Sequence, residues 1–210
     1  SAGLTGRDEE MLAATERSYH ALMDAGETLP AAHAAFWLGF RLLARGDASR
    51  AVGWLGRAEH LVEREGRDCV EQGYLLLPAA TRYIAVGEFG KAHDAAERAA
   101  QFGERFREAD LLAFARNLQA RALLSQGHFE RGLTLMDEAM VAVTSGEHSP
   151  LATGAIYCSA LASCQQLFAG MLVGLNLVGD DHRVHLQSYH GPNERETFAM
   201  YPLPLDDSSG

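Results

Sequence analysis

The sequence predicts an all-α fold: a solenoid of antiparallel helical hairpins with about seven helices, followed by a short β-prone C-terminal segment. Two observations support this prediction. Turn glycines recur at Gly46, Gly87 and Gly127, with spacings of 41 (87 − 46) and 40 (127 − 87) residues. A fixed period of this size is typical of stacked helical hairpins. Small or apolar residues also recur at helical spacing behind each glycine.

The recurring residues follow their turn glycine at the same three offsets in each unit. They are Ala51, Leu55 and Ala58, then Ala92, Ala96 and Ala99, then Gly132, Met136 and Ala139. Where two antiparallel helices joined by a tight turn approach closely, a larger side chain would hold them apart. We therefore expect each hairpin to cross at these positions.

Start and stop residues bound the first helices. Acidic residues near the start and a glycine after the end predict a helix over residues 7–24. Thr28 and Pro30 begin the next helix, which ends near Arg45. Residues 48–65 form its partner, again before a glycine.

The second unit is expected over residues 68–106 and the third over residues 108–144. Pro78 lies inside the first helix of the second unit, where it removes one backbone hydrogen bond and is expected to kink the helix. The carbonyl of Tyr74 then loses its usual partner, which makes it either part of a tolerated bend or a group offered to a ligand. Ser149-Pro150 is expected to open a seventh helix.

The repeat fails at about Phe168. We therefore divide the chain into a helical domain over residues 1–168 and a C-terminal segment over residues 169–210. Residues 171–178 and 184–189 are β-prone, and the Gly-Asp-Asp between them predicts a hairpin turn. The segment is either a truncated second domain or a strand pair that docks on another chain.

The repeat resembles the tetratricopeptide repeat. That family places an apolar-Gly pair and an aromatic residue in the first helix, a turn glycine, and Ala-x3-apolar-x2-Ala in the second helix. Leu38-Gly39 has the first feature and Tyr83 the second. No proline closes any unit and the period exceeds the family's roughly 34 residues, so longer units are implied. The resemblance implies a right-handed, TPR-like solenoid.

A second resemblance covers roughly residues 14–165. The segments RSYHALMDAGETLPAAHAAFWLGFRLLARG, GWLGRAEHLVE and LTLMDEAMVAVTSGEHSP look like the helical-repeat region of large actinobacterial LuxR-type transcription regulators. There such repeats lie between a nucleotide-binding domain and a DNA-binding helix-turn-helix, and this chain has neither. The tail is similar to the opening hairpin of a GAF sensor domain, although it is far too short to be a whole one.

The tetratricopeptide resemblance implies a concave groove lined by the first helix of each hairpin. Carried over by register from the turn glycines, the groove residues are His33, Phe36, Phe40, Tyr74, Leu77, Thr81, Asn117 and Arg121. The Lys and Asn pairs with which some family members clamp a terminal carboxylate are absent, so a helix or an extended apolar peptide suits the groove better. The implied function is a non-catalytic interaction or effector-sensing module in transcriptional regulation, which binds a peptide, a partner domain or a small apolar ligand.

Composition limits the partners. The formal net charge is −10 and the pI is about 5.3, so the chain has no positive field to gather phosphates, and we expect no direct contact with nucleic acid. No stretch approaches the roughly 18 apolar residues of a membrane span. Three cysteines without a CxxC pair, Cys69, Cys158 and Cys164, and no targeting peptide predict buried thiols in the cytoplasm.

No motif for catalysis, a cofactor or a metal is recognised, and we expect none of the three. Gly90-Lys91 does not belong to a phosphate-binding loop, because Ala85 and Ala92 stand where that motif requires glycine and Ser or Thr. His182 and His185 are three apart on a predicted strand and face opposite sides, so they cannot share an ion.

Two alternatives from other classes stay open. The first is an enzyme or a cofactor protein whose site lies between the helices and the tail, near Asp180, His182 and Tyr189. The second is a self-assembly scaffold in which the apolar segment MLVGLNLV becomes buried in a homodimer.

Overall fold

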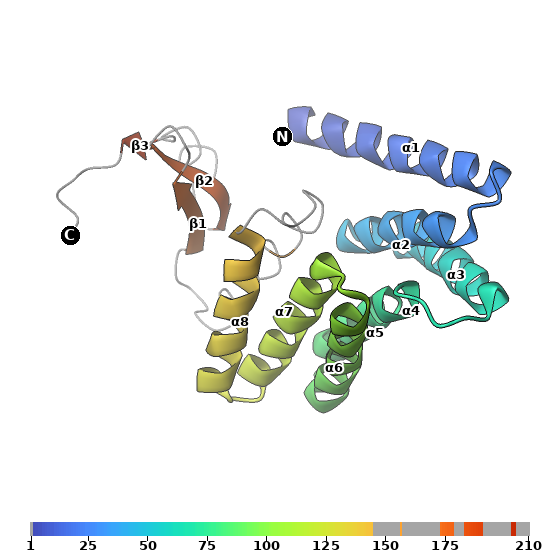
Figure 1. The fold of residues 1–210 in the computed structure, drawn as a ribbon. Coiled ribbons are helices and arrows are strands. Elements are labelled where there is room, and N and C mark those ends of the chain that lie inside the picture. The colour runs from blue at the N-terminus through green and yellow to red at the C-terminus, as the bar shows by residue number, and fades with distance from the viewer. Residues whose placement is uncertain (1, 145–155, 157–172, 179–182, 191–202, 205–210) are drawn as a thin grey trace. The chain divides into compact units, whose positions relative to one another are not determined.

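The computed structural model describes residues 2–144, 156, 173–178, 183–190 and 203–204, with side chains for residues 9–140 and 156 (Figure 1). The chain divides into two compact units, Ser1–Ala115 and Arg116–Gly210, and each is described by itself. The expected domain boundary at residues 168/169 and the helix expected from Ser149-Pro150 lie outside the described residues.

The first unit is helical, and neighbouring helices pack on one another. Its helices are α1 (Ala2–Asp24), α2 (Thr28–Ala44), α3 (Ala48–Glu65), α4 (Glu71–Tyr74), α5 (Leu76–Ala85), α6 (Phe89–Phe106) and the first part of α7 (Ala109–Ser125). Helix α2 packs between α1 and α3, and α5 packs on α6. The prediction of an all-α array of packed neighbours is confirmed for this part of the chain. Helix α1 begins earlier than expected, so its acids lie inside the helix and not in its first turn.

The three turn glycines are confirmed as one recurring structure. Gly46, Gly87 and Gly127 all have positive φ, of 82°, 79° and 84°. After α2, the N–H of Gly46 donates to the carbonyl of Leu43, and the N–H of the next residue reaches back to Leu42 at 2.9 Å. The same pair of bonds closes α5 and α7. Glycine tolerates the left-handed conformation that this closing pattern needs.

The small residues behind each turn are buried where the helices cross. Ala51, Ala92 and Ala99 are fully buried, and Ala58 is 1 % exposed. Glycines permit further close approaches, because a Cβ on Gly39 would lie 2.7 Å from a side-chain atom of Leu55, and one on Gly103 would lie 2.9 Å from the backbone nitrogen of Leu112. The crowding argument made from the repeat is therefore correct.

The interruption expected from Pro78 is present. Residues 71–85 do not form one helix, since α4 ends at Tyr74, Leu75 is a turn residue, and α5 begins at Leu76. A proline has no N–H to donate to the carbonyl four residues earlier, and here that carbonyl belongs to Tyr74. Helix α4 thus ends at Tyr74, the residue whose carbonyl cannot accept a hydrogen bond from Pro78.

The described part of the second unit comprises the rest of α7, α8 (Phe129–Thr144) and three strands. Helix α8 lies against α7 (Figure 1), where a Cβ on Gly132 would lie 2.7 Å from a side-chain atom of Leu124. The strands are β1 (Val173–Val178), β2 (Arg183–His190) and β3 (Leu203–Pro204), in the sheet order β1-β2-β3. Both pairs are antiparallel, and the β1–β2 register shifts between Leu175 and Asn176.

The close approach at Gly103 predicts a measurable cost. Gly103→Ala should lower the free energy of unfolding by about 1–3 kcal/mol, because the new methyl group meets backbone that cannot rotate away. Urea denaturation measures this change.

The matched control is Gly56→Ala on α3, where an added Cβ meets no atom within 4 Å. It should raise the free energy of unfolding by about 0.5–1 kcal/mol, because alanine is the better helix former. A neutral or stabilising Gly103→Ala would contradict the close crossing of α6 and α7.

Candidate functional site

Aromatic side chains of the first unit form one contact network, which we call the aromatic cluster. Its members are His33, Phe36, Trp37 and Phe40 on α2, Tyr74 on α4 and Phe114 on α7. The ring centroids of His33 and Tyr74 are 4.8 Å apart, and those of Phe40 and Phe114 are 5.6 Å apart, both edge to face. These separations are the ones that aromatic pairs favour. The cluster therefore joins three helices that are far apart in the sequence.

The aromatic cluster has a buried side and a solvent side. Phe36, Tyr74, Phe114 and Trp37 are 1 to 6 % exposed and belong to the core. His33 and Phe40 are only partly buried. Phe40 stacks on Phe36, with the ring centroids 5.5 Å apart and an interplanar angle of 21°. Within the cluster, a ligand from solvent can meet His33 and Phe40 directly, and the other rings hold these two in place.

His33 is held as a neutral hydrogen-bond acceptor. The indole Nε1 of Trp37 donates to its Nε2 at 2.9 Å, so the ring proton of the neutral imidazole lies on Nδ1. Burial lowers the pKa of His33, and the carboxylates of Glu71, Glu108 and Asp110 oppose this shift more weakly. The folded state thus favours the uncharged ring.

Carboxylates flank the aromatic cluster. The hydroxyl of Tyr74 donates to Oε1 of Glu108 at 3.0 Å. Burial, followed by the charge of Glu108, raises the pKa of Tyr74, so this hydroxyl stays a donor. Glu71 and Asp110 also act on both His33 and Tyr74, and Oε2 of Glu71 is buried without a hydrogen-bond partner. The negative charge beside the rings would attract a cationic group.

The remaining groove residues from the sequence lie in different surroundings. Leu77 is fully buried, and the partly exposed Thr81 donates its hydroxyl to the carbonyl of Leu77 at 2.9 Å. In the second unit, the fully buried Asn117 donates to Sδ of Met136 at 3.2 Å. Arg121 is partly buried, and burial lowers its pKa. The structure brings together His33, Phe36, Phe40 and Tyr74 from the expected set.

Two members of the aromatic cluster, Trp37 and Phe114, were not expected at the site. A signal for Phe114 was present: His33, Tyr74 and Phe114 each precede their turn glycine by 13 residues (46 − 33, 87 − 74 and 127 − 114). Trp37 follows His33 by four positions and therefore lies on the same face of α2. Repeat register together with helical spacing predicts both.

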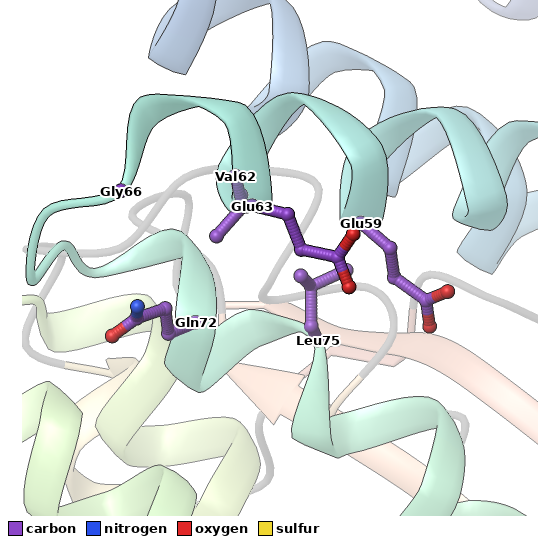
Figure 2. Close-up of a pocket in the computed structure, with 6 residues that line it drawn as sticks. All are labelled: Glu59, Val62, Glu63, Gly66, Gln72 and Leu75. Carbon is purple, nitrogen blue, oxygen red and sulfur yellow. The ribbon is translucent and has the colours of Figure 1, made fainter.

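A separate pocket of about 340 Å³ lies in the same unit between α3 and α4. It is lined by Glu59, Val62, Glu63 and Gly66 from α3 and its C-cap, Gln72 from α4, and Leu75 after it (Figure 2). Figure 2 shows the carboxylates of Glu59 and Glu63 extending to the same side of α3, with Leu75 facing them. Nothing in the repeat pattern pointed to this pocket.

One group on α6 has the geometry of a weak cation site. Ligand atoms of His93, Asp94 and Glu97 lie within 4.8 Å of one another, and Nδ1 of His93 is 3.9 Å from Oδ1 of Asp94. Both carboxylates are exposed on the surface of a single helix, where water competes well for a cation. We base no metal site on this group.

The alternative site in the tail falls mostly outside the described residues. Asp180 and His182 are not described, and Tyr189 lies on β2 without a described side chain. Cys158 and Cys164 are also outside, whereas Cys69 is buried as a free thiol, as expected. None of the helices in the described part of the chain has an apolar run long enough to span a bilayer.

Comparison with protein-family models gave no match, and comparison with curated protein sequences gave none either. The tetratricopeptide and LuxR-type resemblances therefore stay predictions, and the site is interpreted from its own geometry.

The state of His33 predicts a pH dependence of stability. Its pKa in the folded protein lies below the ordinary 6.5 of the unfolded chain, so the unfolded chain binds the additional proton first as the pH falls. The His33 contribution to stability is complete above pH 6.5 and decreases as the pH falls through 6.5 toward the folded-state pKa. Urea unfolding between about pH 8 and pH 5 measures it.

The matched variant is His33→Gln, which keeps an acceptor for the Trp37 indole and cannot titrate in this range. Its free energy of unfolding should fall less steeply with decreasing pH than that of the wild type. Parallel curves for the two proteins would show that His33 is not held in its neutral form.

Proposed function

We propose that the helices form a TPR-like interaction module, and that its site is the solvent side of the aromatic cluster. The ligand best suited to this site is an extended or helical segment of a partner protein that presents apolar side chains beside a lysine or arginine. The LuxR-type resemblance suggests a role in transcriptional regulation, with the right-handed solenoid as scaffold. The β-prone tail would then be an appendage to this module.

The observation that supports the proposal most directly is the position of Phe40. Its ring is stacked on buried Phe36 and packed edge to face on Trp37 and Phe114, yet it stays partly exposed. An aromatic side chain fixed by its neighbours loses little conformational entropy when a partner covers it. An aromatic ring that is held in place and left partly exposed is suited to anchor a protein interface.

The flanking carboxylates support the cationic part of the ligand. Glu71, Glu108 and Asp110 act together on the partly exposed His33, which stays neutral and cannot balance them. A lysine or arginine next to an apolar anchor would complement this charge and would reach the rings through cation–π contact.

Selection from displayed random short peptides tests the proposal. Wild-type chain should enrich peptides that combine aromatic or leucine residues with lysine or arginine. Phe40→Leu keeps most of the side-chain volume but removes the ring. It should lower the affinity for the selected peptides about tenfold and leave the helical circular dichroism signal unchanged. Phe36 is unsuitable for such a test, because it is 1 % exposed and a charge there would be buried.

The control is Phe106→Leu on α6. Phe106 is 37 % exposed and stacks on Phe102, outside the aromatic cluster. The Phe106→Leu variant should therefore leave peptide affinity unchanged. If Phe106→Leu weakens binding as much as Phe40→Leu, or if selection enriches no sequence pattern, the aromatic cluster is not the site.

A further inference from the structure

The pocket between α3 and α4 combines an acidic wall with an apolar floor. Glu59 and Glu63 are exposed and lie one turn apart on α3, while Val62 is 5 % exposed and Leu75 is partly buried. Gln72 adds an amide from α4. The walls come from separate helices, so the hollow depends on the fold and is not formed by one helix alone.

The two carboxylates of the wall have no partner among the described residues. In the described part of the chain, neither Glu59 nor Glu63 takes part in an ion pair or a hydrogen bond. Like charges one turn apart repel each other and destabilise a helix. No basic residue lines the pocket, and Arg67, in the connection after α3, pairs with Glu65 at 2.9 Å.

The end of α3 adds negative potential at the same place. After α2, α5 and α7, three backbone N–H groups beyond the helix return to its last-turn carbonyls, whereas among the described residues after α3 the N–H of Gly66 alone does so, to the carbonyl of Val62 at 3.4 Å. Among the described residues, no backbone N–H beyond the helix reaches the carbonyls of Glu63 or Arg64. A helix C-terminus carries partial negative charge, and this charge is less compensated when its carbonyls are left open.

We propose that this pocket binds an alkyl cation, that is, a guanidinium or ammonium group at the end of an apolar chain. The charged head would lie between Glu59 and Glu63, and its alkyl stem would cover Val62 and Leu75. A volume of about 340 Å³ is near the lower end for small-ligand sites, which suits one such group. The site is separate from the aromatic cluster and does not depend on the function proposed for it.

Nuclear magnetic resonance titration of the full chain tests the assignment. Two cationic probes represent the two possible sources of the ligand. Spermidine represents a free polyamine, and acetyl-Gly-Arg-Gly-amide represents an arginine within a protein chain. The tripeptide with citrulline in place of arginine is the neutral control, because its urea has nearly the same shape without the charge. Saturable shifts of the Gly66 and Gln72 amides with a cationic probe, and none with citrulline, are expected. The tighter of the two cationic probes then identifies the source.

Matched charge variants complete the test. The double variant Glu59→Gln, Glu63→Gln removes both carboxylates from exposed positions. It should lower the affinity for the cationic probes about tenfold or more. Asp94→Asn with Glu97→Gln removes the same charge from exposed positions of α6 and should leave the affinity within about twofold. Absence of saturable shifts at Gly66 and Gln72, equal weakening by the two double variants, or binding of citrulline as tight as that of arginine would each overturn the proposal.

Discussion

The close approach of paired helices at glycine and alanine is the constraint on which the other features of the first unit depend. Gly39 leaves room for Leu55, and Gly103 leaves room for the backbone of Leu112. Since packed interiors tolerate little added volume, these contacts fix how each helix is placed against its partner. The turn glycines fix where each hairpin bends, so residues at one distance before a turn occupy equivalent places. His33, Tyr74 and Phe114 meet in one cluster because both conditions hold.

Most of the helical structure could be predicted from the sequence, because each boundary has a local cause. Gly46 and Gly87 end helices through their positive φ, and Pro78 produces the break at Leu75. Helix α3 is found over Ala48–Glu65, as predicted. Its N-cap Asp47 accepts a hydrogen bond from the backbone of Arg50 at 3.2 Å. Such local signals act within a few residues, so a single sequence reveals them.

The candidate site was less predictable, because burial depends on what covers a face. Repeat register placed Phe36 and Phe40 on one side of α2, but it could not indicate that Tyr74 would cover the first and leave the second partly open. The pocket at Glu59 and Glu63 was missed for a related reason. It depends on the path of residues 66–70 between α3 and α4, and that path follows neither a helical nor a repeat period.

The end of α3, closed by the single backbone hydrogen bond from Gly66, has a consequence for how the protein opens. Cys69 lies in the connection that follows, 4 % exposed, and burial raises the pKa of its thiol. A thiol reagent can reach this sulfur at an appreciable rate only when the connection moves away from the helices. The rate of labelling therefore reports the free energy of that local opening, separately from global unfolding. The chain thus has a native chemical probe next to a helix end that fewer backbone hydrogen bonds close than the ends of α2, α5 and α7.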